Sequence, residues 1–173
     1  MKHVATSICV MRQIHQLFAL AALLLAGCVA PSPSQPKSTA AAPNREQARI
    51  ERRLKEIFDA AEKKDMVRLD SYHFYGPHFT KFSGASPARQ DAAVAREAEH
   101  EGLGSIDGLL MQAENLKIEV YGNVAVTTFV LDCTFMAGNH GVDKKEQATM
   151  ILVRDGGAWK IVHEHFSALK PEP

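Results

Sequence analysis

The C-terminal half of the chain constrains the fold most strongly, because the spacing of its apolar residues changes there from helical to alternating. Four strands are predicted in series, over residues 110–121, 124–135, 147–155 and 159–169. Gly122-Asn123 separates the first two strands and Asp155-Gly156-Gly157 the last two, as is typical of hairpins. A longer turn is predicted over residues 137–145. Successive strands joined by short turns predict an antiparallel meander.

Helical patterns precede these strands. The clearest covers residues 44–64, where Asn44 and Gln47 form a potential capping box. Its apolar residues fall on one stripe: Ile50, Leu54, Ile57, Phe58 and Ala61.

Three further elements are predicted between this helix and the meander. A short helix over residues 66–72 would make apolar contacts through Val67 and Leu69, and residues 79–82 alternate like a strand. Ser86-Pro87 would start a helix that runs to about Glu101 and ends near Gly102 and Gly104. The expected fold is α+β, with N-terminal helices packed on a bent antiparallel sheet of four or more strands.

The N-terminal segment predicts export and a lipid anchor. Residues 17–26 form an unbroken apolar stretch, shorter than the roughly 20 residues that span a bilayer. The stretch ends in Leu25-Ala26-Gly27-Cys28, which resembles the lipobox of bacterial lipoproteins. The resemblance implies a signal peptide over residues 1–27 and a lipid on Cys28 that attaches the protein to a membrane. Translation from Met1 and from Met11 both fit this pattern.

Residues 28–43 predict a tether between the lipid and a domain over residues 44–170. The stretch is rich in Pro, Ser and Ala, and it offers too little apolar surface to fold. Valine instead of aspartate follows Cys28, and by analogy with lipoprotein sorting this favours the outer membrane, facing the periplasm. From Cys28 onward 18 basic and 20 acidic residues give a net charge of −2, and no basic cluster predicts nucleic-acid binding.

The last predicted strand carries the best candidate ligand residues. Strict alternation would place Trp159 and Ile161 on one face together with His163 and His165. If the apolar pair faces the helices, the imidazoles could line a cavity, or they could be hydrogen-bonded structural side chains. A metal site would need His73, His78 or Asp132 as a further ligand, and no strong metal-binding spacing is present. The sequence therefore predicts no metal site.

Other candidates are weaker. Asp132 interrupts an apolar strand and could serve as a general base, and His163 and His165 are alternative candidates for moving protons. Tyr72 and His78 belong to an aromatic segment, residues 72–79, that could line a pocket or cap the core. Cys133 is expected to be a small buried apolar group. No phosphate-binding loop, dinucleotide fingerprint or nucleophile elbow appears, and no cofactor is predicted.

The last two strands resemble a known family. Residues 148–167 contain a strand, the turn Asp155-Gly156 and then Trp159-Lys160-Ile161-Val162-His163, followed by His165 and Ser167. This pattern is similar to the C-terminal signature of SnoaL-like domains, which belong to the nuclear transport factor 2-like (NTF2-like) superfamily. The resemblance implies a cone-shaped α+β fold with a pocket at its open end, and dimers formed through the sheet.

Three functions follow as alternatives, because this fold serves many activities. The first is an anchored envelope lipoprotein whose cone pocket binds a small, partly apolar molecule. The second is an isomerase-type or cyclase-type enzyme that uses a histidine or Asp132. The third is a homodimeric assembly module. A steroid-isomerase-type tyrosine and paired aspartates find no match in this chain, which favours a binding protein over an enzyme.

Overall fold

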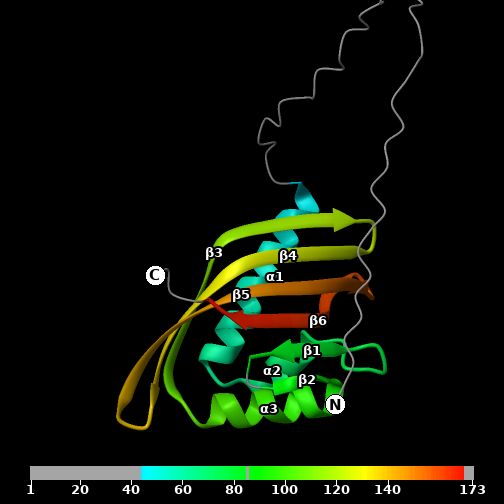
Figure 1. Cartoon of the computed structure of the whole chain (residues 1–173). Helices are drawn as coiled ribbons and strands as arrows, with labels where there is room; N and C mark the ends of the chain where they lie inside the picture. Colours follow the sequence, from blue (N-terminus) through cyan, green and yellow to red (C-terminus); the bar gives the residue numbers. More distant parts are fainter. Residues whose placement is uncertain (1–43, 85, 170–173) are drawn as a thin grey trace, which may run out of the picture. The chain divides into compact units, whose positions relative to one another are not determined.

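The structure, a computed structural model, describes residues 44–84 and 86–169. Within these ranges the chain forms three helices and one curled sheet of six strands (Figure 1). The predicted signal peptide, Cys28 and the tether lie outside the described residues, as does Lys170 at the end of the predicted domain.

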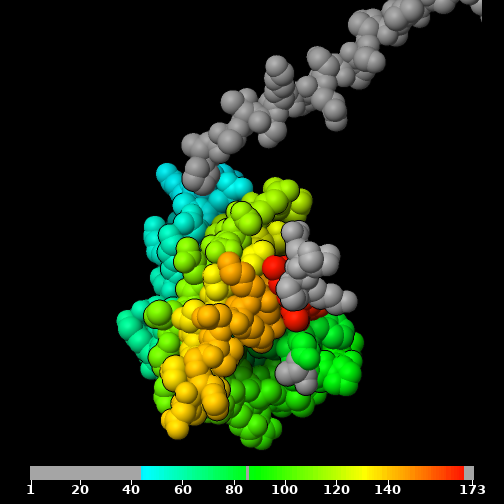
Figure 2. Space-filling view, turned by 60° about the vertical axis from the view of Figure 1, so that its left-hand side comes forward, coloured from blue at the N-terminus to red at the C-terminus, as the bar shows by residue number. Residues whose placement is uncertain are grey.

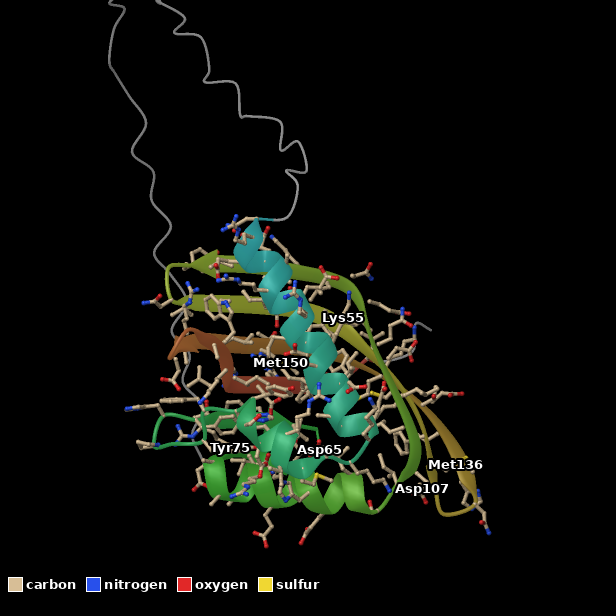
Figure 3. The ribbon with its side chains drawn as sticks, turned by 180° about the vertical axis from the view of Figure 1, so that it is seen from behind. Lys55, Asp65, Tyr75, Asp107, Met136 and Met150 are labelled. Carbon is tan, nitrogen blue, oxygen red and sulfur yellow. The ribbon has the colours of Figure 1, made fainter. Side chains whose placement is uncertain are left out.

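Helix α1 (Arg45–Glu62) confirms the clearest helical prediction. The Asn44 side chain and the Gln47 side chain satisfy the backbone N–H groups at its start as a capping box. The predicted apolar stripe is buried along its whole length. Figure 3 shows α1 lying across one face of the sheet, which we call the inner face.

The other helices differ in part from the predictions. Helix α2 (Met66–Ser71) buries Leu69, whereas Val67 is 84% exposed and makes none of the predicted core contact. Helix α3 (Ala92–Gly104) ends as expected but starts later than predicted. Ser86 and Pro87 begin a strand, and the helix begins after Asp91, whose carboxylate accepts from the Ala93 and Val94 N–H groups.

The sheet is larger than the predicted meander. It contains β1 (Thr80–Ser83), β2 (Ser86–Gln90), β3 (Asp107–Tyr121), β4 (Val124–Ala137), β5 (His140–Asp155) and β6 (Ala158–Ala168). The strand order is β2-β1-β6-β5-β4-β3. Strands β3 to β6 form the predicted antiparallel meander, while β1 adds to β6 in parallel.

The predicted middle turn was wrong. Residues 137–145 belong largely to the strands, because β4 and β5 remain paired as far as Ala137 and His140. A two-residue turn, Gly138-Asn139, closes the hairpin, and Gly138 adopts a positive φ of 60° that favours glycine. The extended hairpin carries the sheet past α1 and brings its end beside α3 (Figures 1 and 2).

The core lies between the inner face and the helices. Alternate residues of β4 and β5 point into it, with Ala125, Phe129 and Leu131 from β4 and Met150 and Leu152 from β5. The outer face of the same strands has no covering helix among the described residues. This leaves two surfaces for function, a covered inner face and an open outer face.

Candidate functional site

A bulge in β6 decides which residues face inward. Ile151 pairs with His163 and Leu152 with Ile161, so Val162 is an extra residue without its own partner. The alternation reverses at this point. Trp159 and Ile161 face inward before the bulge, and Glu164 and Phe166 face inward after it, opposite Met150 and Ala148.

The reversal contradicts the expected position of the two histidines. His163 and His165 lie on the outer face instead of following Trp159 and Ile161 beneath the helices. They border an outer-face hollow of about 500 Å³ together with Phe82, whose ring lies 6.3 and 6.0 Å from the two imidazoles. His163 Nδ1 is 2.8 Å from Thr80 Oγ1, and burial and the neighbouring His165 lower the pKa of His163. Ligand binding by this pair stays a prediction.

The other predicted ligand residues are not gathered at one site. The indole of Trp159 is buried, and its Nε1 donates to Glu46 Oε2 over 3.2 Å. Tyr72 is buried under the guanidinium of Arg53, 4.5 Å from the ring centroid. His78 is exposed in a turn.

Asp132 is not placed as an inner-face general base. It lies on the outer face of β4, partly exposed, with its carboxylate 3.0 Å from Lys145 Nζ. Its position on the outer face and its ion pair with Lys145 keep this carboxylate away from the inner face of the sheet. The structure therefore does not place Asp132 at an inner-face site, and its role as a general base stays a prediction.

An apolar cavity does open on the inner face, between α3 and the ends of β3 to β6. We call it the inner cavity; its volume is about 360 Å³, within the range of small-molecule sites. Figure 2 shows this side of the molecule, with the hairpin of β4 and β5 in yellow and orange beside the green of α3. Its apolar lining includes Leu103, Ile106, Leu109, Leu131, Phe135 and Phe166.

Polar groups are few in the inner cavity. Lys144 and Glu146 line it and form an ion pair of 2.9 Å. Cys133 is buried as expected and also lines the cavity. Burial and the charge of Glu146 raise the pKa of its thiol to about 11, so the thiol is protonated and a poor nucleophile at neutral pH.

Near Phe166, whose ring centroid is 5.4 Å from Lys81 Nζ, lies a group of charged side chains. We call it the buried charge cluster, and its members are His73, Lys81, Glu99 and Glu164. They come from the segment after α2, from β1, from α3 and from β6. Lys81 Nζ is 2.9 Å from Glu164 Oε2 and 3.4 Å from Glu99 Oε1. Its side chain is 12% exposed and that of Glu164 is 3% exposed. The parallel pairing of Lys81 with Glu164 places these two opposite charges side by side.

His73 completes the cluster from the other side. Its Nδ1 is 3.0 Å from the Leu69 carbonyl oxygen, and its Nε2 faces Glu164 Oε1 at 3.5 Å and Glu99 Oε2 at 3.9 Å. Tyr75, labelled in Figure 3, stacks on the imidazole at 4.7 Å and donates its hydroxyl to Glu99 Oε2.

Attraction between the opposite charges in the cluster outweighs the effect of burial on their pKa values. Burial alone would raise the pKa of Glu164, but Lys81 and His73 lower it well below its usual range. Burial would lower the pKa of Lys81 and of His73, but the carboxylates of Glu164 and Glu99 raise both. Glu164 and Lys81 therefore remain ionised in the folded domain.

The sequence did not predict this cluster. The sequence offers His73 only as a further ligand for the β6 histidines, and it gives no reason to single out Lys81, Glu99 or Glu164 as site residues. Alternation in residues 79–82 indicated a strand, but nothing local indicated that it would lie parallel to β6. The bulge at Val162, which turns Glu164 inward, also has no clear local signal.

Solved structures with the same fold share little sequence with this chain. A candidate dehydratase of the NTF2-like family from Streptomyces avermitilis has a TM-score of 0.67 at 14% identity, over 74% of this chain and 99% of that one. A candidate calcium/calmodulin-dependent kinase II association domain from Xanthomonas campestris has a TM-score of 0.65 at 14% identity, over 75% and 91%.

A third similar structure, from Salmonella enterica, is named as an NTF2-like superfamily protein. Its TM-score is 0.63 at 17% identity, over 71% of this chain and 91% of that one. No curated protein matches the chain in sequence. The profile of the SnoaL-like domain matches residues 50–171. With the curled six-stranded sheet and its packed helices, this match shows that the chain belongs to the SnoaL-like domain family and has the NTF2-like fold.

Proposed function

We propose that this domain holds a small, mostly apolar molecule in the inner cavity. The observation that carries the proposal is the lining itself, since apolar side chains surround a volume suited to a small molecule. The ion pair of Lys144 and Glu146 supplies a polar point that could orient one end of the ligand. Relatives in fold include a candidate dehydratase, so binding of small molecules is within the range of this fold.

The lining of the cavity favours binding of a small molecule without catalysis. General acid–base catalysis needs a group that can gain and lose a proton near neutral pH. Among the described residues that line the cavity, the thiol of Cys133 is held protonated and Glu146 is paired with Lys144. The isomerase-type alternative therefore gains no support from the side chains that line the cavity.

The test uses the full chain and an apolar fluorescent probe, N-phenyl-1-naphthylamine. Cys133→Phe fills the inner cavity with a ring, and we expect it to weaken probe binding at least tenfold. Thr128→Phe is the matched control, because it adds the same ring on the outer face of β4. Equal binding by the unsubstituted protein and both variants would reject the cavity as the site. Mass spectrometry of organic extracts provides a second readout, which should show a co-purified apolar molecule that Cys133→Phe loses.

A second candidate function is assembly of two copies through the outer face. Val126 of β4 and Ile151 of β5 are cross-strand partners on this face, and Val124 and Phe82 are 39% and 41% exposed. Apolar side chains on an uncovered sheet are typical of an interface. A similar fold is named as an association domain, which supports assembly as a role for this chain as well.

Sedimentation equilibrium tests this second proposal. We expect the full chain to form a dimer at micromolar concentration and Val126→Lys to shift it to the monomer. Val67→Lys is the control, because Val67 is the most exposed large apolar residue described and belongs to α2. A monomer in the unsubstituted protein would exclude outer-face assembly.

We further propose that a lipid on Cys28 anchors the protein in the outer membrane, facing the periplasm. The sequence Leu25-Ala26-Gly27-Cys28 supports this proposal. None of the helices described by the structure has the length and apolar character needed to cross a bilayer. Metabolic labelling with palmitate should mark the protein, and Cys28→Ser should abolish the label. Recovery of Cys28→Ser with the same label would reject the anchor at this residue, and fractionation of the two membranes tests the location.

A further inference from the structure

We infer that His73, Glu99 and Glu164 form a binding site for a divalent transition-metal ion of the zinc class. Each residue offers one ligand atom, and the three atoms lie within 4.8 Å of one another. One imidazole nitrogen with two carboxylate oxygens is a donor set that suits zinc and its neighbours better than magnesium or calcium, which prefer oxygen alone.

The imidazole of His73 is the first reason. Its side chain is fully buried, and Nε2 has no hydrogen-bond partner although it points at two carboxylates. The opposite nitrogen, Nδ1, lies against the Leu69 carbonyl oxygen, which can only accept, so Nδ1 carries a proton. This arrangement fixes the ring with Nε2 directed into the cluster, as is usual for histidine ligands of metals.

The spacing of the atoms is the second reason. A protonated imidazole beside a buried carboxylate forms a charge-assisted hydrogen bond of about 2.7–2.9 Å. Here the distances from Nε2 are 3.5 Å to Glu164 Oε1 and 3.9 Å to Glu99 Oε2, too long for such a bond. An ion equidistant from the three atoms would lie within roughly 2.4 Å of each, a few tenths longer than ordinary zinc bonds of about 2.0–2.2 Å.

The position of Lys81 is the third reason. Its ammonium contacts Glu99 Oε1 and Glu164 Oε2, while Nε2 of His73 faces the other oxygen of each carboxylate. Lys81 therefore holds the two carboxylates in place without occupying the point between the three ligand atoms. When His73 is neutral and free to bind through Nε2, the two carboxylates and the one ammonium leave a single negative charge, which a bound cation would compensate. Tyr75, which donates to Glu99 Oε2, lies where a group that orients a metal ligand would lie.

Zinc binding to the full chain tests this inference, after removal of metal with a chelator. Equilibrium dialysis should show one tightly bound zinc ion in the unsubstituted protein. His73→Gln and Glu99→Gln should each lower the affinity for zinc at least tenfold. His165→Gln is the matched control, because it removes an imidazole from the outer face of the same domain, and it should retain the ion. Tyr75→Phe should weaken binding by about tenfold, the effect of losing a group that orients a ligand.

A measurement on the unsubstituted protein covers the case in which a variant fails to fold. Nitrogen-15 NMR of the histidine side chains should show that zinc replaces the proton at Nε2 of His73. Three results would overturn the inference: no zinc bound, zinc bound equally by His73→Gln, or Nε2 of His73 still protonated at saturating zinc. In the last case the cation of the cluster is the proton on His73.

Discussion

Two carboxylates in this domain each lie between two cationic partners, one in the interior and one at the surface. Glu164 lies between Lys81 at 2.9 Å and His73 at 3.5 Å, and its side chain is 3% exposed. Asp59 lies 2.6 Å from both Lys63 and Arg68, and its side chain is 37% exposed. Partners of opposite charge lower the pKa of both carboxyl groups.

The two sites differ in what would replace a lost partner. Water can solvate Lys63 and Arg68 if Asp59 is removed, because both remain accessible. Water cannot reach Lys81 and His73 as readily, so a missing partner in the buried charge cluster leaves a charge unsolvated. The contacts of Asp59 are shorter than those of Glu164, but removing them should destabilise the fold less. The reason is that Asp59 and its partners are exposed to water, whereas Glu164 and its partners are buried.

The largest expected effect is that of Glu164→Ala. Breaking a buried ion pair by removing one partner should lower the free energy of unfolding by about 3–5 kcal/mol. Asp59→Ala is the surface counterpart and should cost only a small fraction of that loss. Urea unfolding of metal-free protein measures both, and equal losses would break the comparison.

A smaller effect is expected when both members of the buried pair are replaced. The double variant Lys81→Met with Glu164→Leu should be more stable than the sum of the single changes predicts, by about 0.5–3 kcal/mol. The reason is that neither charge is left alone in the interior. Unfolding of the two single variants and the double variant gives this coupling energy, and strictly additive losses would show that Lys81 and Glu164 do not act as a pair.

Salt should separate the two sites further. In 1 M NaCl the screening length falls to about 3 Å, which weakens interactions between solvent-exposed charges. We expect the coupling between Asp59 and Arg68, measured with Asp59→Asn and Arg68→Gln, to decline from low salt to 1 M NaCl. The coupling between Lys81 and Glu164 should remain, because salt does not enter the cluster. A parallel decline at both sites would indicate that the cluster is open to solvent.

The smallest expected effect is the pH dependence contributed by Asp59. Hydrogen bonds from Lys63 and Arg68 lower its pKa below the ordinary value of 3.8. A carboxyl group whose pKa is lower in the folded state stabilises the fold above its unfolded pKa, and this contribution is lost as the pH falls through its folded pKa. The stability difference between the unsubstituted protein and Asp59→Asn should thus be constant near pH 6 and shrink below about pH 4. Chemical unfolding at a series of pH values checks this, and a difference that grows on acidification would contradict it.

Sequence patterns predicted the elements that depend on neighbours along the chain. The capping box at Asn44, the apolar stripe of α1 and the glycine turns of the meander each depend on residues only a few positions apart. Such patterns were sufficient for the α+β class and for the resemblance to SnoaL-like domains. They failed where a competing local choice existed, as at Ser86-Pro87, which could begin either a helix or a strand.

Tertiary structure decided the candidate sites. The expectation for His163 and His165 assumed unbroken alternation, and one extra residue at Val162 turned both to the outer face and Glu164 to the inner face. The cluster also required β1 to lie parallel to β6, with Lys81 beside Glu164. Alternation along a strand is a local property that a sequence displays. A bulge and the choice of a neighbouring strand depend on packing between distant segments, which no single stretch of sequence contains.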